Sequence, residues 1–151
     1  MLVTNRGKFL LFDWVFRGAT LPTNFYVALV TNAQTPTVDT NTLSQLTEIP
    51  AGNGYTAGGF QLSRNATDFD SLVENDTDDR AELQIKDVTW TASGGPLPST
   101  GGAYYAVLTT DEATVGNRQV IAAWDLSGPV SVSDGQPLTL VDLEIRGLEP
   151  A

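Results

Sequence analysis

The chain has 151 residues, 41% of them hydrophobic and 17% charged, a composition typical of one globular domain. Its formal net charge of −10, with only eight Lys and Arg residues, excludes the large basic surface that nucleic-acid binding requires. The absence of cysteine and histidine excludes disulfides, thiolate nucleophiles and the commonest transition-metal ligands. No apolar run approaches the roughly 20 residues of a membrane span, so we expect neither a nucleic-acid nor a membrane partner.

Residues 5–17 have the pattern of the one α-helix that we expect. Asn5 has a side chain suited to the N-cap, and Gly18 suits the left-handed position that ends a helix. Arg6, Asp13 and Arg17 occupy one narrow side, where Asp13 and Arg17 are spaced for an i,i+4 ion pair. The helix is apolar over most of its circumference.

The apolar surface of this helix is wider than the stripe of roughly 100° that a surface helix uses to cover its own core. One explanation is an unusually enclosed position within the domain, and the other is contact with a neighbouring subunit. The candidates for such an interface are its aromatic residues, Phe9, Phe12, Trp14 and Phe16.

Two apolar stretches, residues 25–30 and 103–109, predict the central strands of a sheet. Both alternating faces of each stretch are apolar, as expected where a strand is covered on two sides. Their aromatic and β-branched residues and their short length favour strands over a buried helix. Residues 32–42, which follow the first stretch, are polar and predict a loop or a weak edge.

Residues 50–59 contain four glycines around Tyr55 and predict a loop. The segment lacks the Lys-Ser/Thr ending of a phosphate-binding loop and does not open a helix. Tyr55 either anchors this loop on the sheet or presents an aromatic side chain to a partner, and it is therefore a further interface candidate.

Residues 65–80 are polar and acidic and predict a solvated loop. Asp76 and Asp78 have the spacing that begins an EF-hand, but the required Gly at position six and Glu at position twelve are missing. This excludes an EF-hand. A loose surface calcium site at Asp76, Asp78 and Asp79 remains the alternative to a solvated loop, because hard cations accept irregular oxygen cages.

One predicted strand changes the parity of its apolar positions part-way along. Leu83 and Ile85 are apolar on odd numbers, and Val88 and Trp90 on even numbers. Because a one-residue slip moves every side chain to the other face, we expect a β-bulge near residues 86–87 that keeps all four on one core.

Two further strands are expected toward the C-terminus. Residues 119–126 predict a strand with Val120, Ala122, Trp124 and Leu126 on one face. The Asp-Gly pair at 134–135 predicts a hairpin turn between residues 129–132 and 137–145. Within 137–145 the apolar parity changes again, at Val141.

About seven short strands without alternating helices indicate a mainly β fold. We expect a single domain over residues 1–151, with the α-helix at 5–17 and an antiparallel β-sandwich at 22–147.

The sequence favours no catalytic site. A serine nucleophile needs a base, and there is no histidine to act as one. No spacing singles out a carboxylate pair among the 18 acidic residues. We therefore expect no enzymatic activity and no cofactor.

Seven short motifs are spread in order over nearly the whole chain: residues 4–8 (TNRGK), 22–29 (PTNFYVAL), 54–59 (GYTAGG), 90–95 (WTASGG), 105–108 (YAVL), 124–126 (WDL) and 134–136 (DGQ). Together they resemble a family of small virion structural proteins of tailed bacteriophages. The resemblance carries over no catalytic residues.

This resemblance implies a virion protein that is assembled in the host cytoplasm. The first expectation is a decoration or cement subunit on the capsid exterior. The alternative is a fibre-like appendage of the tail or collar that contacts the host surface or its glycans. The implied partners are further copies of the chain, with a trimer as the favoured homo-oligomer, and other virion proteins such as the major capsid protein.

Overall fold

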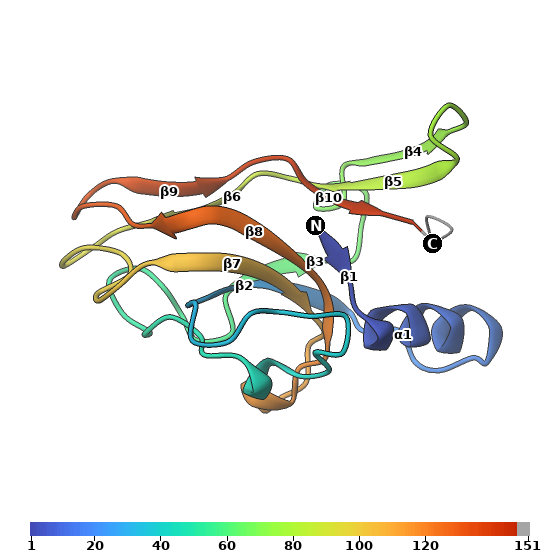
Figure 1. Ribbon diagram of the computed structural model, residues 1–151, viewed down its shortest axis with the longest axis horizontal. Coiled ribbons are helices and arrows are strands. Elements are labelled where there is room, and N and C mark those ends of the chain that lie inside the picture. Colours follow the sequence, from blue (N-terminus) through green and yellow to red (C-terminus); the bar gives the residue numbers. More distant parts are fainter. Residues whose placement is uncertain (148–151) are drawn as a thin grey trace.

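The computed structural model describes residues 1–147, which form two packed layers of antiparallel strands with one helix at one end (Figure 1). The first layer is a sheet in the order β1 (Leu2–Val3), β8 (Val120–Val130), β7 (Ala103–Thr109), β2 (Asn24–Val30) and β3 (Phe60–Ser63). The second layer combines β10 (Leu143–Arg146), β5 (Arg80–Ile85) and β4 (Ser71–Asn75) with the pair β6 (Val88–Thr91) and β9 (Pro137–Leu140). The predicted sandwich with one helix is confirmed, with ten strands in the described part of the chain in place of about seven.

The predicted central strands β2 and β7 pair with each other, and both of their faces are covered. Val27 and Leu29 point into the main core between the layers. Ala28 and Val30 point the other way, under the loops that carry the short 3-10 helices η1 (Leu43–Gln45) and η2 (Val115–Asn117). All of these strand residues are fully buried, as the two-sided apolar pattern predicted.

The predicted bulge at residues 86–87 is a break between β5 and β6. Residues 141–142 separate β9 from β10 directly opposite residues 86–87. The pairing register is therefore the same on both sides of the break, where Ile85 pairs with Leu143 and Val88 with Leu140. Because both partner strands are interrupted together, their side chains change face together. Val141 lies in this break and is 56% exposed, which corrects its prediction as an inward-facing residue.

The four side chains predicted to share a core do so with one exception. Ile85, Val88 and Trp90 belong to the main core. Leu83 is only half-buried, in a row with Leu72 of β4 and Ile145 of β10.

Two predictions about connections are wrong. The solvated loop predicted over residues 65–80 contains strand β4, which pairs with β5. The turn at Asp134 and Gly135 exists, but it is not a hairpin turn, because β9 pairs with β6 in the other layer. The turn therefore connects the two layers.

Helix α1 (Asn5–Phe16) begins at the first residue of the predicted range, but Thr4 and not Asn5 is its N-cap. The Thr4 hydroxyl accepts a hydrogen bond from the Gly7 N–H at 2.8 Å and donates one to the Val120 carbonyl of β8 at 2.6 Å. A Cβ at Gly7 would lie 2.5 Å from the Ile121 carbonyl oxygen, so the glycine allows α1 to rest directly on β8.

The predicted end of the helix is confirmed. Gly18 has a left-handed backbone with φ of 73°, and Asp13 and Arg17 form the expected ion pair at 3.2 Å. Among the described residues, no helix has the length and apolar character needed to cross a membrane.

Candidate functional site

Helix α1 carries a row of exposed apolar side chains. Gly7, Leu10 and Trp14 face the domain. The opposite face and one flank expose five apolar residues, which we call the helix patch: Phe9, Leu11, Phe12, Val15 and Phe16. Contiguous exposed apolar surface of this kind marks interaction sites in soluble proteins. The sequence-based assignment of Phe9, Phe12 and Phe16 as interface candidates agrees with their exposure.

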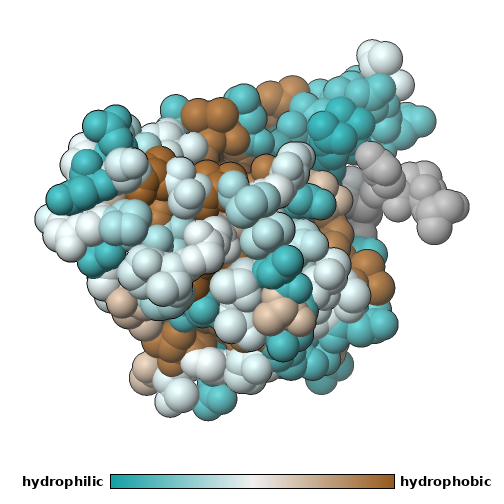
Figure 2. Space-filling view, turned by 60° about the vertical axis from the view of Figure 1, so that its left-hand side comes forward, coloured by the Kyte–Doolittle hydropathy of each residue, from teal (hydrophilic) through white to brown (hydrophobic). Residues whose placement is uncertain are grey.

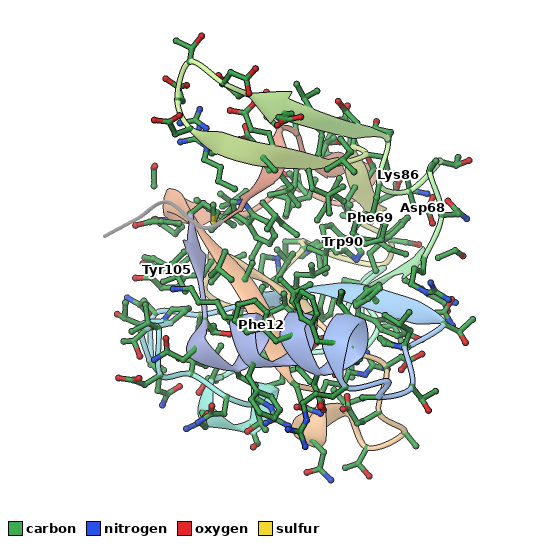
Figure 3. The ribbon with its side chains drawn as sticks, turned by 90° about the vertical axis from the view of Figure 1, so that its right-hand side faces the viewer. Phe12, Asp68, Phe69, Lys86, Trp90 and Tyr105 are labelled. Carbon is green, nitrogen blue, oxygen red and sulfur yellow. The ribbon has the colours of Figure 1, made fainter. Side chains whose placement is uncertain are left out.

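The aromatic side chains of the helix patch have close neighbours on α1. The rings of Phe12 and Phe16 lie 6.2 Å apart, and the guanidinium of Arg6 lies 4.9 Å above the ring of Phe9. Figure 3, which faces this end of the molecule, shows Phe12 on the helix and Phe69 and Trp90 between the two layers. None of the five residues of the helix patch belongs to the main core.

Trp14 does not belong to the helix patch. It is half-buried and packs edge-on against Phe25 of β2, with 6.1 Å between the ring centroids. This corrects its assignment as an interface candidate. The reason is helical geometry, because Trp14 lies one turn beyond Leu10 on the face that rests on the sheet.

Because Trp14 faces the domain and Phe12 faces outward, we expect truncation of the two side chains to have effects of different size on stability. We expect Trp14→Ala to lower the free energy of unfolding by about 1–3 kcal/mol, because it removes part of the packing on Phe25. Phe12→Ala, on the exposed face, should change it by less than about 0.5 kcal/mol. Urea unfolding measures both, and an equal loss in the two variants would contradict the inward orientation of Trp14.

Tyr55 is buried, which corrects its assignment as an exposed interface candidate and supports its alternative role as an anchor. Its hydroxyl donates to the Glu48 carboxylate at 2.6 Å and accepts from the Leu29 N–H at 3.0 Å. The ring lies 5.9 Å from that of Trp90. The loop of residues 50–59 is therefore fixed to the central strand β2.

Glu48 is the centre of a closed polar cluster. Its carboxylate also accepts from the Gly58 N–H at 2.6 Å, and Arg118 donates to the Gly58 carbonyl at 3.1 Å. Burial raises the pKa of Glu48 against the opposing effect of these hydrogen bonds. Burial, and then the Glu48 charge, raise the pKa of Tyr55 well above its ordinary value.

This cluster has the composition of an acid-base site, with Tyr55 buried and Glu48 half-buried. Over residues 1–147, every buried side-chain nitrogen and oxygen has a hydrogen-bond partner. The Oε1 atom of Glu48 accepts from both Tyr55 and Gly58, so this carboxylate helps to hold the loop of residues 50–59 in place.

The three acidic residues considered for calcium lie at the turn between β4 and β5. Asp78 pairs with Arg80 at 3.1 Å and accepts from Asn75, also at 3.1 Å. No three acidic side chains within residues 1–147 are gathered as metal ligands. The structure therefore gives no support to calcium binding at Asp76, Asp78 and Asp79.

Asp68 and Lys86 form a partly buried ion pair that the sequence did not reveal. Lys86 Nζ lies 2.5 Å from Asp68 Oδ1, and the Ser63 N–H donates to Asp68 Oδ2 at 2.7 Å (Figure 3). The hydrogen bond from Lys86, followed by that from Ser63, lowers the pKa of Asp68. The pair fastens the loop before β4 to the break between β5 and β6.

This ion pair predicts a pH-dependent loss of stability. Because folding lowers the pKa of Asp68, its stabilisation is present at neutral pH and is lost as the pH falls through the lowered pKa. We expect Asp68→Asn to lower the free energy of unfolding by about 1–2 kcal/mol at pH 7, since Lys86 is partly screened by solvent. The difference from the wild type should shrink on acidification, and a constant difference in urea unfolding between pH 7 and pH 2 would contradict it.

Comparisons of the chain with known protein families, with curated proteins and with solved structures found no match. The functional argument therefore depends on the residues and their arrangement.

Proposed function

We propose that the protein is a non-enzymatic structural subunit of a bacteriophage particle that attaches through the helix patch. The observation that carries this proposal is the exposure of five apolar side chains on one helix. The chain as a whole is strongly acidic, with a net charge of −10, which keeps free copies apart unless an apolar contact offsets the repulsion. A helix that exposes five apolar side chains is suited to binding another protein subunit.

The motifs that resemble virion proteins coincide with residues that hold the fold together. Residues 4–8 include Thr4 and Gly7, which fix α1 on β8. Residues 54–59 include Tyr55, which anchors its loop. The motifs therefore support a shared architecture with the helix in the same place, which is what a common mode of attachment requires.

Within this proposal, the preferred role is a decoration or cement subunit on the capsid exterior, bound to the major capsid protein and to further copies of itself. A tail or collar appendage is the second candidate, and it would attach through the same helix patch. The appendage role is less well supported, because Tyr55, the residue considered for contact with host glycans, is buried. Neither role requires nucleic acid, a membrane or a cofactor.

The test is the location of the protein on particles. Tagged protein supplied during infection should copurify with particles through a density gradient, and imaging of the tag should place it on the capsid. Phe12→Asp should abolish copurification, because a charge would be buried in the contact. Val141→Asp, a matched change at a residue of similar exposure, should bind as the wild type does. Absence of the wild-type protein from purified particles would refute the proposal.

A further inference from the structure

A second unusual surface lies at the same end of the molecule as α1. The β4–β5 hairpin extends past the sandwich at that end (Figure 1). Leu72 of β4 is 74% exposed and lies directly opposite Leu83, which is paired on its other side with Ile145. Side chains directly opposite across a sheet share one face, so these three form an apolar row whose outer end is open.

The open end of this row borders a hollow of about 770 Å³, lined in part by Leu72, Glu74, Ala81 and Gly147. We call Leu72, Val73 and this hollow the hairpin patch. Val73 is 48% exposed on the other face of the same strand. An exposed edge strand with apolar side chains is a liability unless something covers it.

The two patches carry opposite charge. Residues 5–17 contain three basic residues and one acidic residue, for a formal charge of +2. Residues 70–82 contain six acidic residues and one basic residue, for a formal charge of −5. Figure 2 shows the hairpin end, at the upper right, as mainly hydrophilic. The helix patch is thus an apolar surface in a basic setting, and the hairpin patch an apolar surface in an acidic one.

The helix patch is too small to hold two copies together by itself. An aromatic side chain buries about 150–250 Å², so the exposed parts of the three phenylalanines in the patch amount to roughly 350 Å², and the smaller side chains of Leu11 and Val15 add less than that. A stable interface buries about 800 Å² on each partner. A second contact surface is therefore needed, and the hairpin patch supplies one.

Resting on the proposed function, we propose that the helix patch of one copy binds the hairpin patch of the next. A symmetric contact between two α1 helices is less favourable. It would bring Lys8 and Arg17 of one copy toward the same basic residues of the other and leave Leu72 uncovered. Head-to-tail contact pairs the basic setting with the acidic one and covers both patches. Because both lie at one end of the molecule, copies arranged around an axis beyond that end close into a ring.

The test is complementation between two variants in sedimentation. Phe12→Asp disables the helix patch and Leu72→Asp the hairpin patch, and both residues are exposed enough for the fold to be retained, which circular dichroism checks. We expect the wild type and the control Val141→Asp to form a ring, and each patch variant alone to associate at least 100-fold more weakly. Mixing the two variants should restore one intact contact and give a 1:1 dimer. Raising the salt from 0.05 to 1 M should weaken association, because the steering charges are screened.

Three results would overturn the inference. A Leu72→Asp variant that forms the wild-type oligomer would indicate a symmetric helix contact. A mixture of the two variants that remains monomeric would exclude head-to-tail binding. A monomeric wild type that still requires Phe12 to bind particles would leave the proposed function intact and show that the patch binds another virion protein. If an aspartate variant does not fold, Phe12→Ser and Leu72→Ser repeat the measurement.

Discussion

Tyr55→Ala is expected to lower the free energy of unfolding by about 4–6 kcal/mol. The change removes a buried aromatic ring and leaves a cavity beside Trp90. It also leaves the buried Leu29 N–H without its partner and removes one of the two hydrogen bonds that the Glu48 carboxylate accepts. Urea unfolding at neutral pH measures the loss.

Tyr55→Phe separates the two causes, because it keeps the ring and removes only the hydroxyl. We expect a smaller loss of about 1–3 kcal/mol, which is the cost of leaving buried polar groups unpaired. If Tyr55→Ala instead left stability unchanged and reduced binding to host cells, the tyrosine would be a recognition residue and the tail-appendage role would regain its support.

Gly59→Ala is expected to lower the free energy of unfolding by about 3–5 kcal/mol, from two additive causes. Gly59 has a φ of 86°, and an L-residue in this left-handed region costs about 1–2 kcal/mol. A Cβ there would also lie 2.0 Å from the Val27 carbonyl oxygen of the central strand β2. Backbone on both sides leaves no side chain to move aside, so the strand itself has to shift.

Gly18→Ala is the matched control, because Gly18 has a similar φ of 73° but open space where the Cβ would be. It should show the conformational cost alone, about 1–2 kcal/mol. Equal losses in the two variants, by urea unfolding, would mean that β2 and the loop of residues 50–59 are not in the close contact described above.

The helix patch shows what the pattern of apolar residues in the sequence could predict and what it could not. The excess of apolar residues on α1 was visible in the sequence, but it left two explanations open, an enclosed position within the domain or contact with a neighbouring subunit. The exposure of five of these residues excludes the enclosed position. The sequence could not say which residues face outward. That depends on how α1 docks, and docking is set by Thr4 and Gly7 against Val120 and Ile121, more than 100 residues away in the chain.

The hairpin patch was missed for a different reason. Strand β4 has exposed side chains along most of its length, so it lacks the alternation of apolar and polar residues by which a half-buried strand is recognised. It is a strand because its backbone pairs with β5. The ion pair between Asp68 and Lys86 was missed as well, because its members come together only when the second layer forms.

The sequence by itself determined the fold class, the one helix and the two central strands, because these depend on periodicities within a few residues of one another. It also excluded whole classes of chemistry, because a chain without histidine and cysteine lacks the corresponding groups wherever it folds. Only the tertiary structure decided that Tyr55 is an anchor, that Trp14 faces inward while Phe12 faces outward, and that the hairpin lies at the same end as α1. These facts depend on which distant segments cover a side chain, and that coverage exists only once the two layers have packed.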